Sequence, residues 1–383
     1  IYLDHAASTV VRPAVRAELA RWLTDEVGNP SSSHAAGRAL RTAVEEARER
    51  VATALGAHPQ DVVFTSGGTE ADNLAVKGLV WAGLARGRRH VVTTAVEHPA
   101  VLEPARWIAG HEGLDLSVVG VGRDGRVDVD EVLAAVRGDT ALVSVMAANN
   151  ELGAVNDVAT IGAALRERGV PFHTDAVQAF ATQDVDVAAW SVDALALSAH
   201  KFGGPAGVGI AYLRRGVPVV PLSHGGGQDR GVRSGTLAAA LDAACGVAVE
   251  AAAGDRADLR DRLGALSDRL AAGLLAIDGV RRNGPDDRRR RLPSHVHVSI
   301  DGVDGEALTF ALDQAGLCVS AGAACGAGAQ KASPVLAATG IDGDAAIRLS
   351  LGWTSTETEV DRGIDLVTET VAKLRAVGGG AVR

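Results

Sequence analysis

Residues 197–213, LSAHKFGGPAGVGIAYL, place one lysine, Lys201, between an apolar run and a glycine-rich segment. The residues before the lysine and those at 207–213 both have the apolar character of buried strands. Lys201 would therefore lie at the carboxyl end of a strand, where open α/β sheets bind their ligands. A lysine there can be partly desolvated and can attack an aldehyde cofactor. A surface lysine in a glycine turn is the alternative that this stretch alone leaves open.

Short strand patterns continue on the amino-terminal side of this stretch. Between about residues 60 and 215, β-branched runs alternate with amphipathic stretches such as the expected helix at 69–85. This alternation predicts an α/β fold whose large domain has a mainly parallel seven-stranded sheet with helices on both faces. The expected strands are 61–65, 89–94, 114–120, 140–146, 171–175, 193–198 and 207–213.

A smaller unit is expected after the sheet. The segment from Thr236 to about Ala276 has a helical pattern and would carry the chain out of the large domain. An α+β pattern follows, and its last helix repeats apolar residues over too few heptads for a lone coiled coil, so we expect it to pack on its own domain. The strands expected in this unit are 295–300, 317–320 and 346–352, and the helices are 305–315 and 356–377.

These patterns divide the chain into two predicted domains. Residues 16–250 would form the large domain, and residues 251–383 the small one, which contains a loop at about 318–333. Residues 1–15 would join the small domain.

Composition narrows the class of protein. The 383 residues are 47% hydrophobic, enough for a large core, and 38 basic against 47 acidic residues give a net charge of −9, so no extended nucleic-acid footprint is expected. Three cysteines favour a reduced, cytoplasmic setting over a disulfide framework. The most apolar long stretch, 236–254, contains Asp242 and Glu250 and predicts a packed helix rather than a membrane span. No secretory signal is visible in the first residues.

Two segments suit a phosphorylated aromatic cofactor. Gly67, Gly68 and Thr69 lie between a strand and a helix, where backbone N–H groups can bind a phosphate, although a tight turn explains the glycines as well. Asp175 ends a strand and, with Gln178, can pair with a protonated ring nitrogen, as pyridoxal phosphate requires; a capping aspartate is the alternative.

Other strand ends carry further candidates. His98 can stack on an aromatic ring or can be a structural histidine at the rim. Arg348 interrupts an apolar strand and would meet either an amino-acid carboxylate or a structural acid. His295 and His297 share one strand face, but no third ligand is in view, so no metal site is predicted.

Cys325 lies among small residues in SAGAACGAGA, which predicts a mobile loop where a nucleophilic thiol can reach a substrate. Cys245, in the alanine-rich helix, and Cys318, in a short strand, are expected to be buried small apolar residues.

Ten motifs together resemble those of the cysteine desulfurases, which are fold-type I pyridoxal-phosphate enzymes of the class V aminotransferase group. They occur in order from Tyr2 to about residue 375 and are specific as a set. The motifs are YLDHAAST, GNPSSSHAAGR, TSGGTEADNLAVKG, EHPAVLEP, NNELGAV, HTDAVQ, SAHKFGGPAGVG, HGGGQDRGVRSGT, SAGAACGAG and IRLSLG.

The resemblance implies a role for each candidate. Lys201 would hold pyridoxal phosphate as a Schiff base and later move protons, with His98 stacked on the ring and able to share the acid and base steps. Cys325 would take the sulfur of L-cysteine as a persulfide and release L-alanine, while Arg348 holds the substrate carboxylate. The other implied contacts are Gly68, Thr69, Ser198 and His200 at the phosphate, Asp175 at the ring nitrogen, Gln178 at the phenolic oxygen, Asn150 near cofactor and substrate, and Thr236 from the other subunit of a homodimer.

The cysteine loop departs from the branch of the family with a long loop, which usually reads SGSACTS. This chain reads AGAACGA, so the cysteine is kept, while the loop's hydrogen bonds and any acceptor docking that needs hydroxyl groups are affected. The replacements are Ala321, Ala323, Gly326 and Ala327.

Two rival functions remain at this stage. A selenocysteine lyase or cystine C-S lyase would share the cofactor site without storing sulfur on protein, and Cys325 argues against it. A non-catalytic scaffold of an iron-sulfur assembly complex would not need Lys201, Asp175 and Arg348. The sequence does not identify the sulfur-acceptor protein, which would serve cluster assembly or thiolation.

Overall fold

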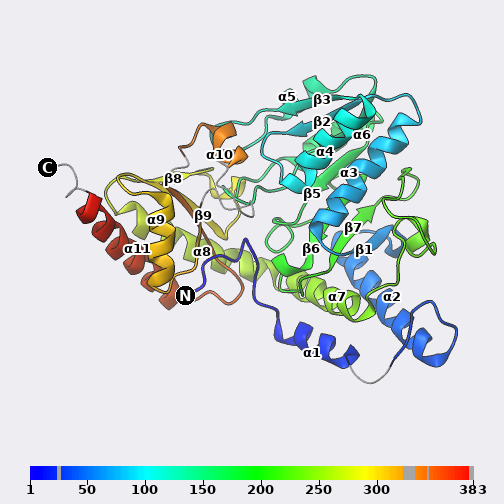
Figure 1. Ribbon diagram of the computed structural model, residues 1–383, viewed down its shortest axis with the longest axis horizontal. Helices are drawn as coiled ribbons and strands as arrows, with labels where there is room; N and C mark the ends of the chain where they lie inside the picture. Colours follow the sequence, from blue (N-terminus) through cyan, green and yellow to red (C-terminus); the bar gives the residue numbers. More distant parts are fainter. Residues whose placement is uncertain (24–26, 322–332, 343–344, 379–383) are drawn as a thin grey trace.

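The computed structural model describes residues 1–23, 27–321, 333–342 and 345–378. These residues form two sheets, one of seven strands and one of four, each with its own hydrophobic core (Figure 1).

The large sheet has the strand order β1-β7-β6-β5-β4-β2-β3. Strands β3, β2, β4, β5 and β6 run parallel to one another, whereas β7 is antiparallel to both β6 and β1. Every strand expected in this region is present, so the prediction of a mainly parallel seven-stranded sheet is confirmed. The strands are β1 (Val62–Thr65), β2 (His90–Thr94), β3 (Asp115–Val119), β4 (Thr140–Ser144), β5 (Phe172–Asp175), β6 (Ala194–Ser198) and β7 (Gly209–Leu213).

Helices cover both faces of this sheet because successive strand residues point to opposite sides. In β1, Val62 and Phe64 join the core beneath α2 and α7, whereas Val63 joins the core beneath α3 and α4. The helices of the large unit are α1 (Pro13–Trp22), α2 (Ala35–Leu55), α3 (Gly68–Leu84), α4 (Pro99–Glu112), α5 (Val129–Ala135), α6 (Val158–Glu167) and α7 (Ala239–Gly254). The 3-10 turns of the described chain are η1 (Pro59–Asp61), η2 (Ala199–Lys201), η3 (Asp229–Gly231) and η4 (Arg288–Arg290).

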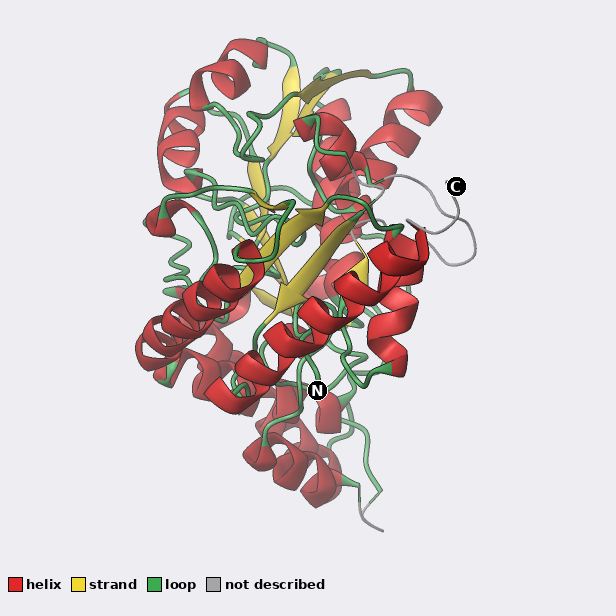
Figure 2. Cartoon of the chain, turned by 90° about the vertical axis from the view of Figure 1, so that its left-hand side faces the viewer, coloured by secondary structure: helices red, strands yellow, loops and turns green. Residues whose placement is uncertain are grey.

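The small sheet is antiparallel, with the order β10-β11-β9-β8. Helices lie over its strands on the side that faces the viewer in Figure 2. Apolar residues of α11, among them Val360, Val367 and Val371, belong to this core, which confirms that the last helix packs on its own unit. The elements are α8 (Arg256–Leu275), β8 (Val280–Asn283), β9 (His295–Ile300), α9 (Gly305–Gln314), β10 (Ser320–Ala321), α10 (Pro334–Thr339), β11 (Ala346–Ser350) and α11 (Glu357–Gly378).

One sequence-based expectation about the small unit is wrong, and it concerns Cys318. The helical pattern at 236–276 corresponds to two helices, because Asp255 leaves the helical conformation (φ −100°, ψ 5°) between α7 and α8. Cys318 is exposed and precedes β10, since the extended chain turns Leu317 into the core and the next residue outward. Cys245 is fully buried, as expected.

The N-terminal segment connects the two units. Leu3 lies in the core of the small sheet, and Tyr2 and Asp4 form β-bridges with Cys318 and Ser350. α7 packs on α1 and α2, whereas α8 packs on α11, which agrees with a boundary near residue 250 that stays a prediction. Among the described helices, none has the length and apolar character needed to cross a membrane.

Candidate active site

Lys201 lies at the carboxyl end of β6, as the sequence predicts. The strand ends at Ser198, and η2 carries the chain through one tight turn to the lysine. The Lys201 Nζ donates hydrogen bonds to the carbonyl oxygens of Ala6 at 2.5 Å and Ala7 at 2.9 Å. These two carbonyls, which no sequence pattern indicated, fix the direction of the amine.

Gln178 points to the same place from the turn after β5. Its Nε2 donates to the Ala6 carbonyl oxygen at 2.9 Å, so this one oxygen accepts from both Gln178 and Lys201. Two residues predicted to contact one cofactor therefore converge on the N-terminal segment.

Asp175 ends β5 on the same edge of the sheet and is buried. Its Oδ1 accepts a hydrogen bond from the Val177 N–H at 2.8 Å. Burial raises the pKa of Asp175, while the nearby His98 and Lys201 act to lower it. Three predicted site residues thus interact electrostatically at the carboxyl edge of the large sheet.

His98 caps the start of α4, and its Nδ1 accepts a hydrogen bond from the Ala100 N–H at 3.1 Å. Burial lowers the pKa of His98, and Lys201 lowers it further while Asp175 opposes this. A neutral ring that accepts at Nδ1 carries its proton at Nε2, so neither nitrogen is free to act as a base. This geometry favours stacking over proton abstraction.

The start of α3 offers an open site for a phosphate. Gly67 caps the helix without a side chain, and the hydroxyl groups of Thr69 and Ser198 make no hydrogen bond within the described residues. A Cβ on Gly68 would lie 3.1 Å from a Val177 methyl group and 3.3 Å from the Ser198 Cβ, so glycine allows the helix start to approach β6. Uncapped N–H groups and two hydroxyl groups at a helix N-terminus suit a phosphate.

His200 lies in η2 next to Lys201. Its Nδ1 is 3.3 Å from the Ser8 Oγ. Burial and the charge of Lys201 lower the pKa of His200 to about 4, so the ring is neutral at pH 7. A neutral His200 can donate one hydrogen bond to an anion without adding a charge.

Arg348 is buried in β11 and holds several partners. Its Nη2 donates to the Asp4 Oδ1 at 2.7 Å and to the Ser320 Oγ at 2.9 Å, and its Nη1 donates to the Asn150 carbonyl oxygen at 3.0 Å. The Nε is buried and has no hydrogen-bond partner among the residues that the structure describes. The structural ion pair considered as an alternative is therefore present, and one buried donor is left for another acceptor.

Asp4 and Ser320 are partners of Arg348 that sequence reasoning missed. Asp4 belongs to the YLDHAAST motif, but nothing in the pattern paired it with a residue 344 positions away. Ser320 pairs with Arg348 across β10 and β11, so the start of β10 lies beside this arginine.

Three buried groups behind Asp175 were also missed. The Asp72 Oδ1 is 3.4 Å from the His173 Nε2, and the His173 Nδ1 is 2.8 Å from the Ser144 Oγ. The Glu97 Oε1 accepts hydrogen bonds from the Met146 N–H and the Thr94 hydroxyl, both at 2.8 Å. Burial raises the pKa of Asp72, and it raises that of Glu97 to about 8. Glu97 therefore holds a proton at pH 7, and burial favours the protonated form of Asp72.

Glu97 predicts a pH dependence of stability. Its pKa rises from 4.5 in the unfolded chain to about 8 in the fold, so its contribution is complete below pH 4.5, falls as the pH rises and is lost above about pH 8. We expect Glu97→Gln to remove this slope, by up to about 1.4 kcal/mol per pH unit, because a neutral amide needs no proton. Denaturant unfolding between pH 5 and pH 8 measures how the free energy of unfolding depends on pH. Glu103→Gln, on the exposed side of α4, should keep the wild-type slope; equal slopes in wild type and Glu97→Gln would contradict the assignment.

Two remaining candidates, Thr236 and Cys325, are not found at the carboxyl edge of the large sheet among the described residues. Thr236 is exposed and its hydroxyl makes no hydrogen bond within the described residues; nearby, Arg233 pairs with Glu70 of α3 at 2.9 Å. Cys325, with Ala323, Gly326 and Ala327, lies outside the described residues, whereas Ala321 ends β10.

His295 and His297 are buried in β9. Burial lowers the pKa of each to about 3, so both rings are neutral. Among the described residues, no cluster of three or more metal-ligating side chains occurs.

Known proteins resemble this chain over almost its full length. The profile of the family described as aminotransferase class-V matches residues 1–362. An IscS-like cysteine desulfurase of Mycobacterium tuberculosis is 44% identical, and the match covers 98% of this chain and 97% of the relative. Cysteine desulfurase IscS of Clostridium botulinum is 40% identical, with 98% and 95% covered. A solved NifS-like protein superposes with a TM-score of 0.91 at 34% identity, covering 98% of this chain and all of the other.

These matches agree with the arrangement of the site. A lysine, an aspartate and a histidine meet at the carboxyl edge of the sheet, beside an uncapped helix start that suits a phosphate. The chain therefore belongs to the class-V aminotransferase family, among its pyridoxal-phosphate-dependent cysteine desulfurases.

Proposed function

We propose that this protein is a cysteine desulfurase that takes the sulfur of L-cysteine onto Cys325 as a persulfide and releases L-alanine. The convergence of Lys201, Asp175 and His98 at one sheet edge is the observation that carries this function. Relatives named cysteine desulfurase, 39–44% identical over nearly the full chain, support the same reaction.

The residues present fit pyridoxal phosphate. Lys201 would hold it covalently, Asp175 would pair with the ring nitrogen, and His98 would lie against the ring. The cofactor supplies an electron sink for the α-carbon of the substrate when it is bound. The residues proposed for its phosphate and phenolic oxygen are Gly68, Thr69, Ser198, His200 and Gln178, with Thr236 reaching from the second subunit of a homodimer.

Proton transfer is assigned to the Lys201 Nζ rather than to His98. The carbonyl oxygens of Ala6 and Ala7 orient the amine, whereas the Nδ1 of His98 is already engaged by a backbone N–H group. An amine held in this way can take a proton from the substrate α-carbon and return it elsewhere on the substrate.

Arg348 would bind the substrate carboxylate near Asn150. Its Nε, which has no partner within the described ranges, offers one donor, and a second hydrogen bond to the substrate requires Asp4 to share or release the Nη2. Asp4 keeps a partner in that event, because the Ser320 hydroxyl donates to the same carboxylate oxygen at 2.9 Å. The site can therefore exchange Asp4 for the substrate without leaving a buried carboxylate unpaired.

The sulfur step balances without an external oxidant. The Cys325 thiolate attacks the substrate sulfur, so an S–S bond forms while the carbon–sulfur bond of L-cysteine breaks. The electron pair of that bond stays on the carbon skeleton, which gains a proton and leaves as L-alanine. A thiolate is the required nucleophile.

Finer points of the biology are also proposals. The IscS names of several relatives support iron-sulfur cluster assembly, with transfer of sulfur to an acceptor protein as the next step. The three cysteines support a reduced, cytoplasmic setting, the net charge of −9 supports a protein that binds no nucleic acid, and no membrane role is proposed. We also propose that residues 16–250 and 251–383 are the two domains, with residues 1–15 attached to the second.

Product analysis tests the reaction class. The purified holoenzyme, given L-cysteine and a thiol reductant, should form L-alanine and sulfide in equal amounts and no pyruvate. L-cystine and L-selenocysteine are assayed in parallel. Pyruvate from L-cystine without alanine from L-cysteine would favour a C-S lyase, alanine from L-selenocysteine alone would favour a selenocysteine lyase, and no turnover at all would favour a scaffold.

A further inference from the structure

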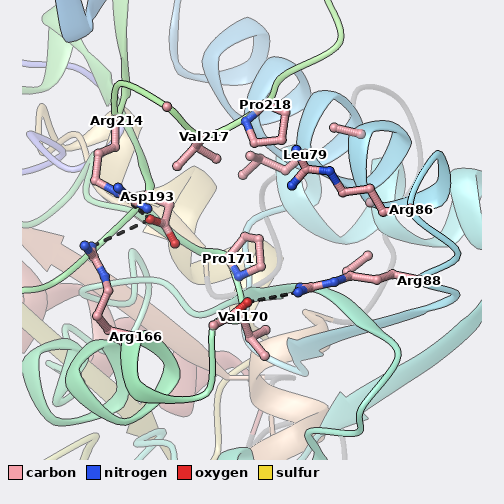
Figure 3. Close-up of a pocket in the computed structure, with 15 residues that line it drawn as sticks. Leu79, Arg86, Arg88, Arg166, Val170, Pro171, Asp193, Arg214, Val217 and Pro218 are labelled. Atoms are coloured by element: carbon pink, nitrogen blue, oxygen red, sulfur yellow. Dashed lines mark hydrogen bonds and ion pairs between the residues drawn. The ribbon is translucent and has the colours of Figure 1, made fainter.

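A second pocket lies at the opposite edge of the large sheet. Its volume is about 190 Å³, below the roughly 300–1,000 Å³ of sites for drug-sized ligands, so it suits a smaller occupant. The wall comes from α3, from the segments that enter β2, β5 and β6, and from the segment that follows β7 (Figure 3). Because β5 and β6 end at Asp175 and Ser198, the pocket and the proposed active site lie at opposite ends of the same strands.

The pocket carries an excess of positive charge. Four arginines line it, and Asp193 is the single acid among the lining residues that the structure describes. Four guanidinium groups against one carboxylate leave an excess of three charges. Guanidinium groups bind carboxylates and phosphates through paired hydrogen bonds.

Arg166 and Arg214 form one end of the pocket and share Asp193. The Asp193 Oδ1 is 2.7 Å from the Arg214 Nε and 3.6 Å from an Arg166 Nη2, while its Oδ2 accepts from the Phe172 N–H at 2.9 Å. The carboxylate is thus fixed by the backbone, and it offsets one of the two positive charges.

Arg86 and Arg88 form the other end, where the described lining residues include no acid. Arg88 donates to the carbonyl oxygens of Thr140 and Gly169, each at 3.0 Å, so neutral acceptors hold it in place. Within the described part of the chain, the guanidinium group of Arg86 makes no hydrogen bond or ion pair, and only its backbone N–H is bonded, to the Gly83 carbonyl oxygen at 2.9 Å. Two guanidinium charges therefore remain to be balanced at this end.

Apolar side chains separate the two ends. Figure 3 shows Leu79, Pro171 and Val217 between the pair Arg86 and Arg88 on one side and the pair Arg166 and Arg214 on the other. We propose that this pocket binds a small organic anion with two acidic groups on a short carbon skeleton. One acidic group pairs with Arg86 and Arg88, the skeleton lies on the apolar wall, and the second group meets Arg166 and Arg214.

Isothermal titration of the holoenzyme tests this site, with succinate as the probe and succinamide as its uncharged analogue. Succinate should bind once per chain and succinamide should not bind. Arg86→Gln should weaken succinate binding at least about tenfold, or ~1.4 kcal/mol, because it removes the guanidinium charge that no described acid balances. Arg289→Gln, which removes an 89% exposed arginine of the small unit, should leave the affinity unchanged.

The proposed site would be contradicted if succinate did not bind at about 10-fold molar excess over a millimolar protein concentration. It would also be contradicted if the wild type and Arg86→Gln bound succinate equally well, or if sulfate bound as tightly as succinate. Equal binding by the variant would place succinate at another cation, such as Arg348 of the active site. Turnover of L-cysteine by Arg86→Gln should match the wild type, which also shows that the variant is folded.

Discussion

The Lys201→Ala variant loses its covalently held pyridoxal phosphate and its turnover of L-cysteine falls by at least about a thousandfold. The amine at this position is both the point of attachment of the cofactor and the group proposed to move protons. The methyl side chain of alanine can do neither. Borohydride reduction of the wild type, followed by digestion and mass spectrometry, should place the cofactor on the peptide that contains Lys201. The variant should show no cofactor mass on any peptide.

Lys373→Ala is the matched control, because Lys373 lies on the exposed side of α11. It should keep the cofactor and the wild-type rate. Substantial turnover by Lys201→Ala without an added amine, or the cofactor on the Lys373 peptide, would refute the assignment of Lys201.

Much of the large unit could be predicted because its strands are short and all except β3 are buried along their whole length. Each run between residues 60 and 215 carried that signal, and each became a strand. β8 (Val280–Asn283) gave no signal, since an edge strand with the sequence VRRN needs no apolar pattern. The segment 236–276 was predicted to be helical without the position of the break at Asp255, because a single polar residue does not distinguish one helix from two.

The active-site residues likewise include some that the local sequence predicts and others that it does not. The position of Lys201, Asp175 and His98 could be predicted since each lies at or just after the end of a strand, and parallel strands bring their carboxyl ends to one edge. The partners that arrive from distant segments could not be predicted: Asp4 on Arg348, and the Ala6 carbonyl oxygen on Lys201 and Gln178. Such pairs depend on how the N-terminal segment crosses between the sheets, which no local pattern records.

Cys325→Ser should stop the release of L-alanine, with a loss of at least about a thousandfold, while the holoenzyme still forms. A serine hydroxyl is hardly ionised near neutral pH, whereas a cysteine thiol with a pKa near ~8.5 supplies thiolate. Lys201, Asp175 and Arg348 are untouched, so the cofactor should stay bound and L-cysteine should still change its visible spectrum. Alanine release, followed in single turnover, measures the effect.

Cys318→Ser is the sharper of two controls because Cys318 is exposed and can accept sulfur without any movement of the fold. Cys245 is fully buried and its burial raises the pKa of the thiol, so it should be unreactive. Both Cys318→Ser and Cys245→Ser should release alanine at the wild-type rate. A wild-type rate in Cys325→Ser would instead point to a lyase that needs no protein thiol.

The position of the transferred sulfur tests the central claim most directly. After a pulse of L-cysteine on the holoenzyme and rapid blocking of thiols, mass spectrometry of the digest should find one additional sulfur on the peptide that contains Cys325. The peptides with Cys245 and Cys318 should carry none. An additional sulfur on the Cys318 peptide, or alanine formed with no sulfur on any peptide, would contradict sulfur storage on Cys325.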